Sequence, residues 1–249
     1  NKNVCISYME LYNGDCLEIM KDLSDNSIDL LFCDLPYGQT RCKWDCLIDL
    51  DLFWKQINRI CKDGSPMFFT CSTKFGVSLI NSNPKNFRYD LVWVKSSPCG
   101  FLNAKKMPMK KHEMVYVFYN KLPKVYTENI AEHHTHKFKE VTSVIKHPPR
   151  KAGIKNPYDG MNGSEKGTYD PPLPNSILEI SSQKGKHATQ KPVDLIKWCL
   201  KYYSKEGDVV LDPTMGSGST GVACKDMNRQ FIGVEMDEAI FNVAVERLE

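Results

Sequence analysis

The chain has 249 residues, 41% of them hydrophobic and 25% charged, and a formal net charge of +3. This composition is typical of a globular protein with a sizeable core, and the length fits one α/β domain that carries an insertion. No apolar run approaches the roughly 20 residues that a membrane-spanning helix needs, and the first residues lack a signal-peptide pattern, so we expect a cytoplasmic protein.

Ten cysteines are spread along the chain without a CxxC pair. Several of them lie in apolar runs, so we expect reduced structural thiols and not a disulfide framework. Cys42 and Cys46 are close in sequence, and His133, His134 and His136 offer nitrogen ligands. Because no second cysteine pair stands at ligand spacing, we expect no metal site.

Apolar runs bounded by turn residues predict strands, and stretches of helical periodicity that begin near Pro or end at Gly predict helices. The expected strands are residues 27–36, 66–72, 89–96, 112–119, 208–213 and 230–237, and the expected helices are 51–64, 191–207 and 237–249. Strands that alternate with helices indicate an α/β fold with a mostly parallel, twisted sheet and helices on both faces.

The first informative motif is LFCDLPYGQT, at residues 31–40. A buried-type strand stops at Asp34, and Leu35, Pro36 and Tyr37 follow before a glycine turns the chain. Taken alone, this motif indicates no more than a turn after a strand. A functional interpretation depends on the motifs that accompany it.

A glycine-rich loop follows the expected strand that ends at Asp212. Gly216 and Gly218 let the backbone approach a ligand closely, and the N–H groups of the helix that follows can bind it. Glu235, at the end of the next strand, can accept hydrogen bonds from both hydroxyls of a ribose. The GxGxxG spacing completed by Gly221 leaves a nicotinamide enzyme open, whereas a P-loop is excluded because no Gly-Lys-Ser/Thr follows.

Three segments stand in a specific order: DLPYG at 34–38, HATQKP at 187–192 and DPTMGSGST at 212–220. Together they resemble the motifs of the β class of S-adenosylmethionine-dependent amino-group DNA methyltransferases, in which the catalytic motif precedes the cofactor loop. The resemblance implies a Rossmann-like class I methyltransferase fold, with residues 1–249 as a single domain of circularly permuted motif order. Leu35 stands where the family commonly has a proline, but the main-chain carbonyl is the functional group there.

By this resemblance, an adenine flipped out of DNA meets the methyl donor at Asp34. The carboxylate accepts one hydrogen of the N6 amino group, and the main-chain carbonyl of Leu35 accepts the other. Pro36 stiffens the turn, and Tyr37 stacks on the base. The expected reaction is a direct displacement without a covalent enzyme intermediate.

The same resemblance implies a larger set of residues around the cofactor, S-adenosylmethionine. Within the set, Thr189 and Lys191 are candidates for the methionine carboxylate and Asp15 for the region of the adenine. The HATQKP segment also reads as a helix start, and the segment around Asp15 as a turn after a strand. The set consists of Asp15, Cys33, Asp34, His187, Thr189, Gln190, Lys191, Asp212, Pro213, Gly216, Ser217, Gly218, Ser219, Thr220, Glu235 and Met236.

A basic segment interrupts the alternation of strands and helices. Between residues 95 and 155 there are 13 Lys or Arg against 4 acidic residues, a local net charge of +9, and residues from about 120 to 180 are irregular in pattern. We interpret residues 100–182 as a basic target-recognition insertion that contacts DNA phosphates. The candidate contacts are Lys105, Lys106, Lys110 and Lys111. Because Lys outnumbers Arg 27 to 6, we expect salt-dependent binding with a short or relaxed recognition sequence.

The sequence is therefore interpreted as a site-specific DNA methyltransferase that modifies N6 of adenine. Asp34 favours adenine, because the cytosine enzymes that resemble this family more often carry serine there; N4-cytosine and RNA adenine methylation stay open as alternatives. A nicotinamide oxidoreductase or a catalytically silent DNA-binding module would not explain all three motifs. Duplex DNA is the expected partner, and the resemblance also allows a homodimer.

Overall fold

The computed structural model describes residues 2–36, 48–126, 174–182 and 190–249. All of these except Pro174 belong to one compact unit, Asn1–Thr127 with Asn175–Glu249; a second unit is Glu128–Pro174. No helix within the described ranges is long and apolar enough to span a membrane. The single domain with an insertion at 100–182 stays a prediction.

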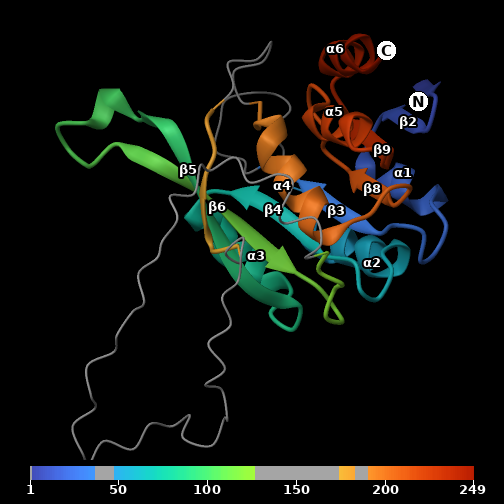
Figure 1. The fold of residues 1–249 in the computed structure, drawn as a ribbon, viewed down its shortest axis with the longest axis horizontal. Coiled ribbons are helices and arrows are strands. Elements are labelled where there is room, and N and C mark those ends of the chain that lie inside the picture. The colour runs from blue at the N-terminus through green and yellow to red at the C-terminus, as the bar shows by residue number, and fades with distance from the viewer. Residues whose placement is uncertain (1, 37–47, 127–173, 183–189) are drawn as a thin grey trace, which may run out of the picture. The chain divides into compact units, whose positions relative to one another are not determined.

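A nine-stranded sheet organises the first unit (Figure 1). Five neighbouring strands, β2, β9, β8, β3 and β4, are parallel to one another. Strand β1 is antiparallel to β2, β6 is antiparallel to both β4 and β5, and the edge strand β7 is parallel to β5. In spatial order the strands are β1 (Lys2–Ile6), β2 (Met9–Asn13), β9 (Gln230–Glu235), β8 (Val209–Asp212), β3 (Leu30–Cys33), β4 (Met67–Cys71), β6 (Lys110–Phe118), β5 (Phe87–Cys99) and β7 (Ile177–Glu179).

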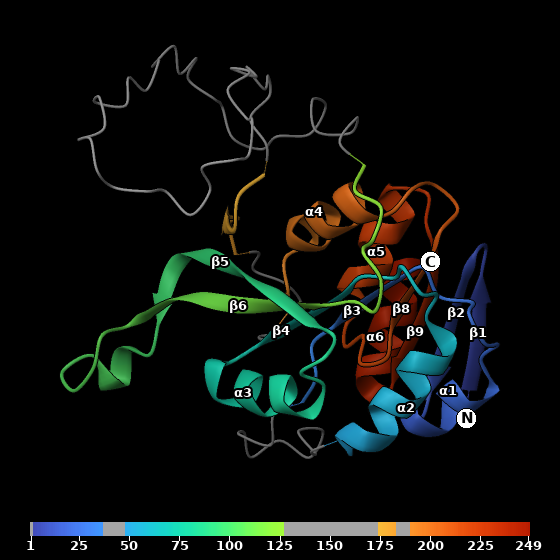
Figure 2. The same ribbon diagram turned by 90° about the horizontal axis from the view of Figure 1, so that it is seen from below.

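Helices cover both faces of this sheet (Figure 2). Successive side chains of a strand point to opposite faces, so the buried run of β3 serves two cores. Leu31 and Cys33 pack in the cluster that holds α1, α2 and α3, whereas Leu30 and Phe32 pack in the cluster that holds α4, α5 and α6. The helices are α1 (Cys16–Asp22), α2 (Leu50–Ile60), α3 (Thr73–Ser82), α4 (Val193–Tyr203), α5 (Ser219–Asp226) and α6 (Glu238–Leu248).

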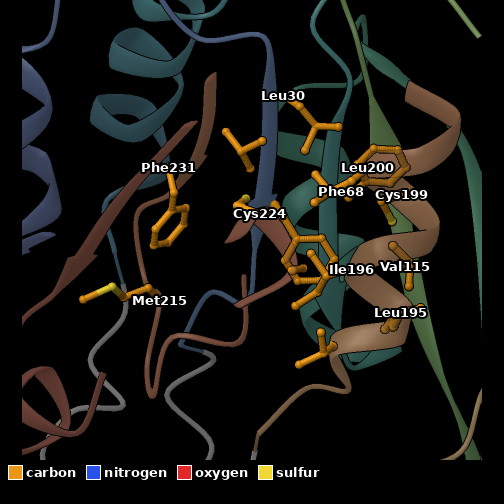
Figure 3. Packing of buried hydrophobic residues seen from close by; sticks show 14 of the residues in the cluster. Leu30, Phe68, Val115, Leu195, Ile196, Cys199, Leu200, Met215, Cys224 and Phe231 are labelled. Carbon is orange, nitrogen blue, oxygen red and sulfur yellow. The ribbon is translucent and has the colours of Figure 1, made fainter. Parts of the chain in front are cut away.

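The packing of α4 shows how a sheet face is closed. Ile196, Cys199 and Leu200 of this helix are fully buried, and they belong to one cluster with Leu30 and Phe68 of the central strands (Figure 3). Burying a Leu or Ile side chain contributes about 1.5–3 kcal/mol each. The apolar stripe of α4 therefore holds the start of this helix, directly after the buried Pro192, against the sheet.

The predicted fold class is confirmed, and each predicted strand overlaps an observed one: β3, β4, β5, β6, β8 and β9. The predicted helices correspond to α2, α4 and α6, although each is shorter than expected. Strands β1 and β7 and helices α1 and α3 were not predicted. Helix α3 contains Gly76, a poor helix former, and a Cβ atom there would lie 2.2 Å from the ring of Tyr116.

The predicted insertion at 100–182 overlaps the sheet. Strand β6 lies between β4 and β5 and pairs with both, so the first part of this segment is structural. Residues 127–173 lie outside the described residues. The irregular part of the insertion thus falls almost entirely on that range.

Gly233→Ala should destabilise the protein by about 1–3 kcal/mol, the usual cost of overpacking a core. A Cβ atom at Gly233 would lie 2.3 Å from Met215 Sδ and 2.7 Å from the ring of Phe231. Urea denaturation measures the change. Gly64→Ala is the matched control, because its Cβ would approach only the carbonyl oxygen of Leu122, at 3.9 Å. Equal stability of the two variants would contradict the prediction.

Candidate active site

The carboxyl ends of β2, β9, β8, β3 and β4 lie at one edge of the sheet, because these neighbouring strands are parallel. Ligands of open parallel sheets bind at this edge. Asp34 directly follows β3, Asp212 ends β8 and Glu235 ends β9. Three acidic side chains from opposite ends of the sequence are thus brought to one edge.

Thr214 connects the strand ends β3 and β8. Its hydroxyl donates to the main-chain oxygen of Asp34 at 3.2 Å, and its N–H donates to Asp212 Oδ1 at 3.1 Å. The same hydroxyl lies 3.3 Å from the buried thiol of Cys33. Asp34 therefore lies beside the strand that precedes the glycine loop, while the roles of these residues stay predictions.

The carboxylate of Asp34 has a defined partner on each oxygen. The hydroxyl of Thr70, in β4, donates to Oδ1 at 2.7 Å, and the ammonium of Lys191 donates to Oδ2 at 2.6 Å. Thr70 is fully buried and the Lys191 side chain is 13% exposed. A carboxylate accepts hydrogen bonds on both oxygens, so these two contacts orient Asp34.

Lys191 belongs to a chain of alternating charges. Its Nζ lies 3.7 Å from Glu113 Oε2, in β6, and Glu113 also forms an ion pair with Lys95 of β5. Burial acts to lower the pKa of Lys191, but the charges of Asp34 and Glu113 outweigh it, so the pKa is raised and the side chain stays an ammonium. The predicted contact of Lys191 with a cofactor carboxylate stays a prediction, and here its ammonium binds Asp34.

The glycine loop forms an open turn between β8 and α5. Gly216 and Gly218 have φ angles of 52° and 82°, in the left-handed region that glycine adopts without strain. A Cβ atom at Gly216 would meet nothing in the described part of the chain within 4 Å. Gly218 starts α5 without a side-chain cap, which leaves backbone N–H groups of the first turn for a ligand.

Two carboxylates support this loop in different ways. Glu235 accepts hydrogen bonds from the N–H of Gly216 at 3.1 Å and from the N–H of Asp237 at 2.8 Å, and burial raises its pKa. Asp212 is buried and accepts from the hydroxyl of Thr220. Burial raises the pKa of Asp212 to about 7, although its hydrogen bonds act in the opposite direction.

Other predicted cofactor residues lie near the same edge. Gln190 accepts a hydrogen bond from the buried Ser217 at 3.5 Å, which joins the HATQKP segment to the glycine loop. Asp15 follows β2 and caps α1 by accepting from the N–H of Leu17, so a helix begins where the sequence was interpreted as a turn after a strand; its predicted cofactor contact stays a prediction. Pro213 and Ser219 are buried within the loop and helix start, and Met236 is 52% exposed beyond β9. Tyr37, His187 and Thr189 lie outside the described residues.

The four predicted DNA-binding lysines lie on the hairpin that β5 and β6 form. Lys105 and Lys106 are in its turn, and Lys110 and Lys111 begin β6; all four are exposed. Among the described residues, the eight cysteines are free thiols and no group of three or more His, Cys, Asp or Glu side chains is arranged to hold a metal ion.

Sequence reasoning missed Thr70, Glu113 and Thr214. Thr70 and Glu113 stand in runs that read as apolar strands, where a polar residue that is buried must have a partner. A polar residue inside an apolar strand was therefore the feature of the sequence that could have identified Thr70 and Glu113. Their partners could not be named, because Asp34, which accepts from Thr70, and Lys191, which lies near Glu113, are far from them along the chain.

The family model for DNA methylases that modify N6 or N4 amino groups matches residues 28–246. The chain belongs to this amino-group DNA methyltransferase family. Its function is therefore the methylation of DNA, and the methyl donor is S-adenosylmethionine. The glycine loop fits this donor: it leaves open space over Gly216, presents free N–H groups at α5 and places Glu235 beside them.

Relatives of known name agree with this membership. The Type II methyltransferase M1.MboII of Moraxella bovis is 26% identical over 94% of both chains. The crystal structure of the M1.HpyAVI–SAM complex has a TM-score of 0.62 and 24% identity, covering 96% of this chain and all of that one. The PvuII cytosine-N4-specific DNA methyltransferase has a TM-score of 0.67 and 17% identity, covering 97% and 86%. At these identities the structural likenesses establish the fold.

Thr70→Val should lower kcat while leaving the affinity for S-adenosylmethionine unchanged. A hydrogen bond to a charged group is worth about 1.5–3 kcal/mol, so losing the bond that orients Asp34 should slow methyl transfer by about 10- to 100-fold. Thr70→Ser is the control and should restore most of the rate, because it keeps the hydroxyl. Equal loss in both variants would assign Thr70 to packing alone.

Asp212→Asn should flatten the pH dependence of stability. The pKa of Asp212 is raised from 3.8 to about 7, so the folded protein keeps a proton that the unfolded chain releases. The free energy of unfolding should therefore fall as the pH rises from about 4 to about 7, and the asparagine variant should lose less over that range. Urea denaturation across this range tests it, with the exposed Asp22→Asn as control. Parallel curves for all three proteins would refute the assignment.

Proposed function

We propose that this DNA methyltransferase transfers the methyl group of S-adenosylmethionine to N6 of an adenine that is flipped out of duplex DNA. The observation that carries the proposal is the pair of contacts from Thr214, which hold Asp34 beside the end of the strand that leads into the glycine loop. An amino-group acceptor and a nucleoside-binding loop thereby share one edge of the sheet. A target base inside a duplex cannot reach this edge, so it must leave the stack.

Asp34 would orient the amino group. Its carboxylate is held by Thr70 and Lys191 and would accept one N6 hydrogen. The main-chain carbonyl of Leu35 follows directly and would accept the second hydrogen. Negative charge at Asp34 also favours the positive charge that develops on nitrogen during transfer. We keep Pro36 and Tyr37 in their predicted roles, as the support of the turn and the stacking surface.

The cofactor would lie along the glycine loop. Glu235 would bind the ribose hydroxyls, and the backbone at Gly216 and Gly218 would approach the donor closely. When bound, S-adenosylmethionine supplies a methyl group on a positively charged sulfur, a strong electrophile. The chain's contribution is to hold donor and acceptor in line, an orientation effect worth about 7–11 kcal/mol in well-placed systems.

The rest of the proposal concerns the partners. We keep residues 1–249 as a single methyltransferase domain in which the catalytic motif precedes the cofactor loop, and residues 100–182 as its target-recognition part. Lys105, Lys106, Lys110 and Lys111 would contact DNA phosphates, in a protein that works in the cytoplasm as a monomer or homodimer. The N4 amino group of cytosine is the alternative acceptor, and the identity of the methylated nucleoside decides between them.

Asp34→Ala should reduce methyl transfer by about 10²-fold or more, as expected when a group that stabilises transition-state charge is removed. Its affinity for S-adenosylmethionine should change little. DNA from cells that express the unaltered protein or the variant is digested and analysed for N6-methyladenine and N4-methylcytosine, and sequencing maps the modified sites. N4-methylcytosine as the product would overturn the adenine assignment, and labelling of RNA in place of duplex DNA would overturn the substrate.

A further inference from the structure

The hairpin of β5 and β6 extends beyond the rest of the sheet (Figures 1 and 2). Strand β4 pairs with β6 only from Met114 to Phe118, and β7 pairs with β5 only from Val92 to Val94. Among the described residues, 95–111 therefore have strand partners only within the hairpin, although Ser96 Oγ also accepts a hydrogen bond from the N–H of Ser182 at 3.3 Å. We call residues 100–109 the hairpin tip.

The hairpin tip exposes large apolar side chains. Phe101 is 81% exposed, Leu102 is 96% exposed and Met107 is 58% exposed. Monomeric proteins rarely place such side chains together at the end of a projection without a binding role. The exposed apolar side chains of the tip therefore indicate a binding surface.

The backbone of the tip is a defined turn. Gly100 adopts a φ of 93°, and the N–H groups of Asn103, Lys106 and Met107 bond to carbonyls within the turn at 2.8–3.0 Å. The apolar side chains are thus attached to a backbone of defined conformation. Ordering such a projection on binding costs less conformational entropy than ordering a free loop.

The positive charge around the tip indicates which kind of partner would bind there. Residues 91–112 contain five lysines and neither Asp nor Glu. A buried aromatic side chain covers about 150–250 Å², far less than the roughly 800 Å² per partner of a stable protein interface. Two or three apolar side chains with lysines around them suit a polyanion that offers a small apolar site. A DNA base step has this arrangement, because the stacked bases are apolar and lie between two phosphate backbones.

The hairpin is also joined to the candidate active site. Lys95, where the projecting part of the hairpin begins, forms an ion pair with Glu113. Glu113 lies within ion-pair distance of Lys191, which binds Asp34. These residues come from β5, β6, the segment before α4 and the end of β3. The tip therefore has a fixed relation to the carboxylate that would receive the base.

We propose that Phe101 and Leu102, at the hairpin tip, insert between base pairs of the duplex and fill the gap that the target adenine leaves, while Lys105, Lys106, Lys110 and Lys111 bind the flanking phosphates. The proposal rests on the proposed function. Unstacking a base step costs a few kcal/mol, and an apolar wedge lowers that cost by occupying the opened space. The tip would then contribute to base extrusion and not to cofactor binding.

The test compares Phe101→Ser/Leu102→Ser with the unaltered protein on two duplexes that carry the mapped target sequence. In one the target adenine is paired, and in the other it faces an abasic position, so that it is already unpaired. The double variant should be slower by about tenfold or more on the paired duplex, equivalent to about 1.4 kcal/mol, and within about twofold of the unaltered protein on the unpaired one. The affinity for S-adenosylmethionine should not change.

Two controls make the result specific. Leu122→Ser makes the same change at another leucine, 81% exposed, and should leave the rate on both duplexes unchanged. Lys105→Gln/Lys106→Gln should weaken binding to both duplexes alike and reduce the slope of log affinity against log salt by about 2.

Three results would overturn the proposal. The double variant could match the unaltered protein on the paired duplex, or it could be impaired equally on both duplexes. Sedimentation velocity could show that it has lost a dimer, which would assign the tip to a second copy of the chain. In each case the unaltered protein still methylates DNA, so failure of this inference differs from failure of the proposed function.

Discussion

The parallel pairing of β3 with β8 is the constraint on which the site depends. These strands are about 180 positions apart in the sequence, yet their pairing brings Asp34 and Asp212 to the same edge. Two carboxylates placed close together repel each other unless the surroundings treat them differently. Lys191 compensates the charge of Asp34, whereas burial raises the pKa of Asp212 to about 7. The two acids at this edge thereby have different surroundings, Asp34 in an ion pair and Asp212 buried and hydrogen-bonded to Thr214 and Thr220.

The buried charges also tie several elements into one unit. Lys95, Glu113, Lys191 and Asp34 alternate in sign, and each comes from a different segment of the chain. Removing one member of such a set leaves another charge in a poorly solvated place, which is more costly than losing an exposed ion pair. The antiparallel strand β6 is therefore part of the active-site architecture as well as the support of the hairpin.

The sequence was sufficient for the elements whose pattern is local. The apolar runs of β3, β8 and β9, and the residues that end them, could be recognised because a buried parallel strand must be apolar on both faces. The contact between Lys191 and Asp34 could not be recognised, because it joins positions 157 residues apart. The role of Thr70 could not be recognised for the same reason. A hydroxyl inside an apolar strand can be interpreted only when its acceptor, here the residue after β3, is known. Asp15 shows a different case: its helix-capping role is local, but the segment was interpreted as a cofactor contact or a turn after a strand, and the seven-residue helix that it caps was not predicted.

Structural hydrogen bonds and ligand binding use the same groups at this edge. Each oxygen of Glu235 already accepts one backbone N–H, from Gly216 or Asp237, and each still has a second acceptor position. These bonds therefore shape the loop by themselves, and a ribose bound to Glu235, as we propose, would add hydrogen bonds without breaking those that hold the turn. The same holds for Asp34, which Thr70 and Lys191 orient before a base is present. Since catalysis by orientation requires groups that are fixed in advance, the polar contacts of the strand ends belong to the chemistry as much as to the fold.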